Sequence, residues 1–256
     1  MSPGDAPPLS DAQLDRYARH IVLPQIGGAG QKALLAANVA VVGAGGIGSP
    51  LVQYLAAAGI GRITLFDDDA VALSNLQRQT IFTTADIGRA KVAVARERAA
   101  ALNPDVALTP IHRRLTDDNA ALLLHGHDVI VDGCDNFATR LAVADAALEL
   151  RIPLVSAAVG RFEGQLAVYR GWEAGKPCYR CFVGADPDRP EESCADQGVL
   201  GALTGVLGSL AAMEAIRCLT GFGEDSAGKL LLVDALALRF RTLILPKDPG
   251  CPTCAA

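Results

Sequence analysis

The feature that most constrains the fold is a glycine-rich segment, Gly43-Ala44-Gly45-Gly46-Ile47-Gly48, which matches the pattern G-x-G-x-x-G. It follows an apolar, β-branched stretch at 38–42 that predicts a strand, and it precedes a stretch of helical composition at 51–58 that ends at Gly59. A strand, a glycine turn and a helix in this order predict a site where the backbone approaches a phosphate and the helix N-terminus offers free N–H groups. The alternative is a tight turn that only packs the helix on the sheet.

Strand and helix signals continue to alternate through the first half of the chain. Further strands are predicted at 62–66, 106–108, 129–131 and 154–155, and helices at 89–102 and from near Phe137. An earlier helix is predicted from Ser10, with Gln13 at capping-box spacing, to about Ile21. This alternation predicts βαβ units and therefore an α/β, Rossmann-like fold with a largely parallel sheet.

The second half has a different pattern. Strands are predicted at 165–169, 229–233 and 238–245, with one buried helix at 199–217 between the first and the others. In the last strand Arg239 and Arg241 alternate with apolar residues, which predicts that one face meets water. We therefore expect the sheet to continue into a mixed or antiparallel half.

Charge and hydropathy exclude two classes of partner. The chain has 23 basic and 28 acidic residues, a net charge of −5, which does not favour non-specific nucleic-acid binding. The longest uncharged run, 197–213, is shorter than the roughly 20 residues of a membrane-spanning helix and contains several glycines, so it predicts a buried helix. Residues 1–8 do not have the pattern of a secretory signal. We expect a cytoplasmic protein with neither a nucleic-acid nor a membrane partner.

An acidic run, Asp67-Asp68-Asp69, follows the second predicted strand. Asp67 lies about twenty residues after the glycine turn, the position at which a carboxylate commonly binds a ribose hydroxyl. Taken alone, this arrangement favours an NAD(P)-dependent dehydrogenase.

The residues that follow favour a terminal triphosphate instead. Amides and cations gather after the acidic run, and a further acidic and amide pair ends the strand at 129–131; they are Ser74, Asn75, Arg78, Gln79, Lys91, Asp135 and Asn136. When pyrophosphate leaves a triphosphate, fixed cations stabilise the negative charge that develops on it. The internal pyrophosphate of a dinucleotide does not leave, and the N–H groups at a helix N-terminus are enough to bind it. We expect Asp135 to hold Mg²⁺ near the α-phosphate, or to cap the helix that begins near Phe137.

Two C-x-x-C pairs stand far apart in the chain, Cys178 with Cys181 and Cys251 with Cys254. Four thiolates with this spacing are typical of a closed, structural Zn²⁺ site that would tie the C-terminus to the second half of the protein. A redox role is the alternative, but neither pair precedes a helix in a βαβ unit.

Together these motifs, with the run Arg16-Tyr17-Ala18-Arg19-His20, resemble the bacterial E1-like adenylyltransferases of the ThiF/MoeB/HesA group over about residues 16–254. Members of the group activate the C-terminal Gly-Gly carboxylate of a ubiquitin-like sulfur carrier as an acyl adenylate and release pyrophosphate. The resemblance implies ATP and Mg²⁺ as cofactors beside Zn²⁺, and a homodimer in which Arg19 reaches the partner subunit's ATP. It also implies adenine and ribose contacts near Gly46 and Asp67.

The candidate site residues follow from the motifs and the resemblance. The candidate catalytic residues are Arg19, Arg78, Asp135 and Cys194, and the candidate nucleotide-binding residues are Gly43, Gly45, Gly46, Gly48, Asp67, Asp69, Ser74, Asn75, Arg78, Gln79, Lys91, Asp135 and Asn136. Cys194 is included because some relatives carry a thiol in the corresponding loop that accepts the activated carrier, while in others that thiol is dispensable.

The predicted organisation is a single domain over 1–256, with a helical arm at 9–36, a nucleotide-binding half at 37–155 and a carrier-binding and zinc half at 156–256. We expect ATP-dependent adenylylation of a ThiS-like or MoaD-like carrier for thiamine or molybdopterin biosynthesis. Because the sequence ends just after the second cysteine pair, the persulfide sulfur is expected to come from a separate protein. The alternatives are the dehydrogenase and a non-catalytic, zinc-containing binding protein.

Overall fold

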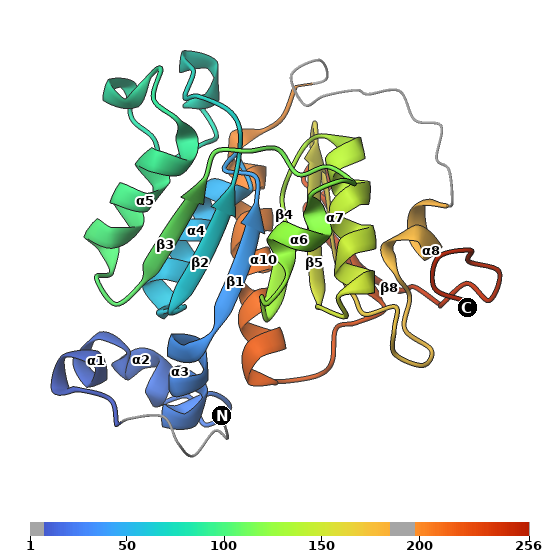
Figure 1. Ribbon diagram of the computed structural model, residues 1–256, viewed down its shortest axis with the longest axis horizontal. Helices are drawn as coiled ribbons and strands as arrows, with labels where there is room; N and C mark the ends of the chain where they lie inside the picture. The colour runs from blue at the N-terminus through green and yellow to red at the C-terminus, as the bar shows by residue number, and fades with distance from the viewer. Residues whose placement is uncertain (1–7, 185–197, 256) are drawn as a thin grey trace.

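The computed structural model describes residues 8–184 and 198–255 of the chain, which form an α/β structure around one eight-stranded sheet (Figure 1). The strand order is β3-β2-β1-β4-β5-β6-β7-β8. The strands are β1 (Asn38–Val42), β2 (Arg62–Phe66), β3 (Ala107–Ile111), β4 (Val129–Asp132), β5 (Leu154–Gly160), β6 (Glu163–Tyr169), β7 (Lys229–Asp234) and β8 (Arg239–Ile244). Neighbouring strands from β3 to β5 pair in parallel, and those from β5 to β8 pair antiparallel. The predicted change from a parallel to an antiparallel half is confirmed.

Helices cover both faces of the parallel half. The helices of the described residues are α1 (Asp11–Arg16), α2 (Ala18–Ile21), α3 (Gly27–Ala36), α4 (Gly48–Ala58), α5 (Lys91–Leu102), α6 (Ala120–Leu124), α7 (Phe137–Glu149), α8 (Tyr179–Val183) and α10 (Gly201–Thr220), with 3₁₀ turns η1 (Leu73–Asn75) and η2 (Thr84–Asp86); α1 and α2 lie beyond the end of the sheet (Figure 1). Successive residues of β1 point to opposite faces, so Val39 and Val41 join a core with α3, α4, α5 and α10, while Ala40 and Val42 join one with α6, α7 and α8. Burial on both faces explains why residues 39–42 of β1 are an unbroken apolar run.

The N-terminal arm differs from the single helix expected for residues 10–21. Ser10 and Gln13 form the predicted capping box, but the chain leaves helical geometry at Tyr17 (φ −103°, ψ 12°) between α1 and α2. Tyr17 is buried, donates a hydrogen bond to Asp105 and accepts one from Asn103. These contacts anchor the arm to the nucleotide-binding half at the place where the helix breaks.

α10 is the buried helix predicted from its glycine-rich, apolar sequence. Among the described residues it is the one helix long and apolar enough to cross a membrane by length and composition. Its residues Leu203, Leu207 and Ala211 are nevertheless buried in the same core as α4 and β5. α10 is therefore a core helix, as expected.

The expectation for the last strand is wrong in one respect. All six residues of β8 are exposed, so both faces of this edge strand meet solvent, rather than one. No described helix packs over β8, and its alternation of arginine with apolar residues therefore does not indicate a buried face.

Candidate active site

A cavity of about 470 Å³ opens at the carboxyl ends of the parallel strands. It lies around β1 and β4, the neighbouring strands whose chain connections leave the sheet in opposite directions, where open α/β sheets bind their ligands. The structure brings most of the candidate residues together in its lining: Gly43, Gly45, Gly46, Asp67, Asp69, Arg78, Gln79, Lys91, Asp135 and Asn136. Gly48, Ser74 and Asn75 are not among the lining residues.

The glycines of the turn have different roles. Gly43 has a φ of +92°, and a Cβ there would lie 3.2 Å from the backbone of Cys134. A Cβ on Gly48 would lie 1.9 Å from the carbonyl oxygen of Gly43, so this residue is fixed by the tightness of the turn. A Cβ on Gly45 would meet only the amide nitrogen of Gln79, at 3.7 Å. Gly45 thus presents bare backbone to the cavity, as a phosphate cradle requires.

Asp67 closes the turn against the end of β2. Its carboxylate accepts hydrogen bonds from the backbone N–H of Ala44 at 2.7 Å and of Asp69 at 2.9 Å. Burial raises the pKa of Asp67, while Lys91 and these N–H groups act in the opposite direction. The carboxylate lines the cavity at the place expected for a ribose-binding group.

The two predicted cations reach the cavity from different elements. Lys91 begins α5, and its buried ammonium group lies 2.8 Å from the carboxylate of Asp69. Arg78 follows η1 and donates a hydrogen bond to the carbonyl oxygen of Ser74, while the side-chain oxygen of Asn75 accepts from the N–H of Ala72. Ser74 and Asn75 therefore shape the turn that presents Arg78, instead of lining the cavity.

Asp135 is available for a ligand because a different residue caps α7. The side chain of Asn136 accepts a hydrogen bond from the N–H of Thr139 at 2.8 Å and is the N-cap, so the alternative that Asp135 caps this helix is wrong. Asp135 lines the cavity, and within residues 8–184 and 198–255 its carboxylate has no hydrogen bond or ion pair. Mg²⁺ is commonly held by one or two carboxylates together with substrate phosphates, and Asp135 fits that donor set.

Gln79 supplies a second indication that the cavity receives a polar ligand. Its side chain is buried, and its amide oxygen has no hydrogen-bond partner among the described residues. A buried acceptor without a partner is unfavourable by about 1–3 kcal/mol, and a ligand donor in the cavity would remove that cost.

Several lining residues were missed by the sequence analysis. They are Arg113, Arg114, Arg140, Gln165 and Thr204. Arg114 is held by the carboxylate of Asp68, with 3.1 Å between Nε and the oxygen. The adjacent arginines directly after the third strand were the available signal, whereas the other three residues lie on elements that only the fold brings to the cavity.

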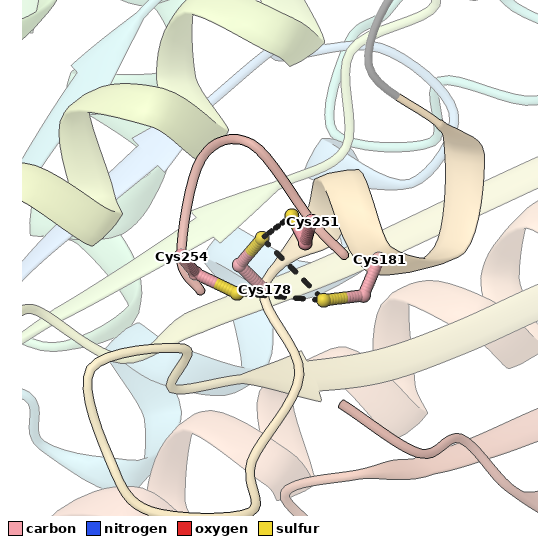
Figure 2. Close-up of side chains that lie close together, drawn as sticks. All are labelled: Cys178, Cys181, Cys251 and Cys254. Atoms are coloured by element: carbon pink, nitrogen blue, oxygen red, sulfur yellow. Dashed lines mark hydrogen bonds between the residues drawn. The ribbon is translucent and has the colours of Figure 1, made fainter. Parts of the chain in front are cut away.

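The four cysteines of the two C-x-x-C pairs meet beside α8, as Figure 2 shows. Neighbouring sulfurs are 3.5–3.8 Å apart, and all four lie within 4.8 Å of one another. Four thiolates about 2.3 Å from a tetrahedral Zn²⁺ would have sulfurs about 3.8 Å apart. The cluster therefore fits zinc, and none of these cysteines forms a disulfide. Because Cys251 and Cys254 lie near the C-terminus, a bound ion would tie that segment to α8.

The remaining candidates lie away from this cavity or outside the described residues. Arg19 is exposed on α2, at the opposite end of the sheet, and does not line the cavity of its own chain (Figure 1). Cys194 lies outside the described residues. Burial raises the pKa of the Cys134 thiol well above its usual value and that of Cys218 to about 12, so neither is a ready nucleophile.

Comparison with known proteins decides the family. A scan against protein families matches the ThiF family over residues 17–253. The chain belongs to the ThiF family. One ThiF relative, the sulfur carrier protein adenylyltransferase of Thermus thermophilus, is 48% identical over 247 residues, which cover 94% of this chain and 91% of the relative.

Further relatives match over nearly their full lengths. The molybdopterin-synthase adenylyltransferase of Escherichia coli is 42% identical over 96% of this chain and 98% of its own. The sulfur carrier protein ThiS adenylyltransferase of E. coli is 44% identical over 96% and 97%. The crystal structure of E. coli MccB with ATP superposes with a TM-score of 0.82 at 22% identity, covering 94% of this chain and 75% of that one, and confirms the fold.

Proposed function

We propose that this ThiF-family chain is an adenylyltransferase that uses ATP to activate the C-terminal Gly-Gly carboxylate of a ubiquitin-like sulfur carrier protein. The names of its relatives include a sulfur carrier protein, the carrier ThiS and molybdopterin synthase, which supports a carrier that serves thiamine or molybdopterin biosynthesis. The observation that carries the proposal is the gathering of an open glycine turn, two cations and an unpaired carboxylate in one cavity. A dehydrogenase would leave Arg78, Lys91 and Asp135 without a role.

The reaction forms one bond and breaks one bond at phosphorus. A carboxylate oxygen of the carrier attacks the α-phosphorus of ATP, the bond from that phosphorus to the bridging oxygen breaks, and pyrophosphate leaves with the electron pair. The glycine turn and the N-terminus of α4 hold the phosphates, and Asp67 holds the ribose. Arg78 and Lys91 stabilise the charge that grows on the leaving pyrophosphate.

Two metal ions belong to this proposal. Asp135 would hold Mg²⁺, which supplies charge neutralisation and orientation at the phosphates when it is bound. The four-cysteine cluster would hold a structural Zn²⁺, whose contribution is to the stability of the C-terminal half.

A second cavity, of about 690 Å³, supports a path for the carrier's C-terminal segment. It lies over the antiparallel half and shares Ala158, Val159 and Gln165 with the nucleotide cavity. An extended Gly-Gly segment lying in the second cavity would reach the α-phosphate through these shared residues. The second cavity supports our proposal that the half at 156–256 binds the carrier.

The remaining parts of the proposal concern assembly and location. We assign a cytoplasmic homodimer in which Arg19, exposed and away from its own cavity, reaches the partner subunit's ATP.

The test is ATP–pyrophosphate exchange with purified chain, Mg²⁺ and candidate carriers ending in Gly-Gly. Exchange is expected only when a carrier with a free C-terminal glycine is present, because its carboxylate is the attacking group. A carrier with one residue added after the last glycine is the matched control and should not support exchange. Exchange that proceeds without any carrier would overturn the proposed substrate.

A further inference from the structure

Arg140 is a buried cation beside the nucleotide cavity to which the reaction assigns no role. It lies in the first turns of α7, and its side chain is only 8% exposed. Its guanidinium group lies 3.2 Å from the carboxylate of Asp132, a residue that is fully buried at the end of β4. A buried ion pair of this kind requires good geometry and further hydrogen bonds to offset desolvation.

Further hydrogen bonds from Arg140 connect β5 with the loop that follows β4 and borders the cavity. Arg140 donates to the hydroxyl of Ser156 at 3.0 Å and to the carbonyl oxygen of Ala157 at 3.1 Å, both on β5. It also donates to the carbonyl oxygen of Cys134, in the loop that follows β4. One planar guanidinium thus holds β5 and this loop in a fixed relation.

The loop is held from its other side as well. The N–H of Cys134 donates to the carboxylate of Asp132 at 3.0 Å, and a Cβ on Gly43 would lie 3.2 Å from the Cys134 backbone. Cys134 is therefore placed between Arg140, Asp132 and the glycine turn. The carboxylate of the next residue, Asp135, has no hydrogen bond or ion pair within the described residues, so its position depends on the backbone of Cys134.

We propose that Arg140 is a positioning residue for adenylation: by binding the carbonyl oxygen of Cys134, it sets the place of Asp135 relative to the glycine turn. This inference rests on the proposed function, because it concerns the geometry of the α-phosphate site. Arg140 acts through the loop, and its contacts with β5 also fix the strand that continues toward the second cavity.

Two variants separate this role from general stability. Arg140→Lys keeps a positive charge beside Asp132. A lysine ammonium group, however, cannot donate hydrogen bonds to Ser156, Ala157 and Cys134 at the same time, as the planar guanidinium group does. Ser156→Ala removes one partner of Arg140 on β5, together with the hydrogen bond that the Ser156 hydroxyl donates to Asp132, and leaves the contacts of Arg140 with Asp132 and Cys134 in place. The first variant should release the loop, and the second should retain it.

The chain contains its own reporter for loop position. Cys134 is the thiol on the loop, and Cys218, a partly buried thiol on α10, is the internal control for wider unfolding. The alkylation rate of each of these two thiols is measured by peptide mass spectrometry, with full-length, zinc-loaded protein and no ATP. In Arg140→Lys, the rate at Cys134 should rise about tenfold or more while the rate at Cys218 stays at the wild-type value, as expected for local opening.

The kinetic expectation is a split between two constants. In Arg140→Lys, kcat for pyrophosphate exchange should fall about 100-fold while KM for ATP changes less than about threefold, because misplacing a group at the reacting centre affects the reaction more than binding. Ser156→Ala should keep both constants and the Cys134 rate near wild type.

Three results would overturn the inference: an unchanged Cys134 rate in Arg140→Lys, equal increases at Cys134 and Cys218, or a rise in KM without a fall in kcat. Failure of the proposed function is distinguishable, because the wild-type protein would then show no carrier-dependent exchange. The alkylation result does not depend on that activity.

Discussion

Replacing Gly45 with alanine tests whether the glycine turn cradles phosphate or only packs α4 on the sheet. The added Cβ would meet only the amide nitrogen of Gln79, at 3.7 Å, and the φ of Gly45 lies outside the left-handed region. The fold should therefore tolerate the change, and lower entropy of the unfolded chain should stabilise the protein by about 0.4–1 kcal/mol.

The same methyl group would occupy the cavity where a phosphate must approach the backbone. Loss of one hydrogen bond from a backbone N–H to a charged oxygen weakens binding by about 1.5–3 kcal/mol. That corresponds to a rise of about 10- to 150-fold in the Kd for ATP. The expected signature is weaker ATP binding in a protein whose melting temperature is unchanged or slightly raised.

Gly48 provides the matched control in the same turn. Its added Cβ would lie 1.9 Å from the carbonyl oxygen of Gly43, a backbone atom that has no room to move. Gly48→Ala should therefore lose stability by more than the roughly 1–3 kcal/mol of ordinary overpacking. Thermal unfolding and calorimetric titration with ATP measure both variants. If Gly45→Ala folds normally and binds ATP within twofold of wild type, the phosphates do not contact this part of the turn.

Four further predictions test other parts of the molecule. Arg78→Ala should slow pyrophosphate exchange by about 10²- to 10³-fold, as expected when one preorganised charge is removed, and near-normal exchange would remove Arg78 from the site. Mixing inactive Arg19→Ala and Asp135→Asn proteins should restore part of the exchange activity, since one mixed site would hold both native groups; no recovery despite demonstrated subunit exchange would mean that Arg19 does not act across subunits. Cys251→Ser should lower the zinc content and the melting temperature together, and full zinc occupancy would refute the ligand set. The pKa of Asp86 lies below its usual range, chiefly because the hydroxyl of Thr83 donates a hydrogen bond to its carboxylate. The ionised carboxylate therefore stabilises the folded protein above about pH 4, and this stabilisation is lost as the pH falls toward the lowered pKa. Asp86→Asn should accordingly lower the free energy of unfolding by about 1–3 kcal/mol at pH 7 in urea titrations, with a smaller difference at pH 3; a difference independent of pH would contradict this reasoning.

The sequence by itself determined the elements whose signals are local. The predicted strands at 38–42 and 62–66 have the bounds of β1 and β2, and the capping box at Ser10 is present. The paired cysteine spacing also indicated the cluster that the fold assembles. In each case the signal is a pattern of a few neighbouring residues. Such a pattern is enough to determine the local backbone geometry or to supply a pair of metal ligands.

Tertiary structure decided what local patterns leave open. Asp135 and Asn136 are both good helix caps by composition, and only the path of the chain assigns the cap to Asn136 and leaves Asp135 in the cavity. The alternation in β8 does not reveal whether another element covers that strand, and it remains exposed on both faces. Arg140 joins β4 and the loop after β4, which precede it closely in the chain, to Ser156 and Ala157 of β5, which the sequence pattern does not connect with it. Such contacts depend on which strands become neighbours, and that is determined by packing of the whole sheet rather than by any single stretch of residues.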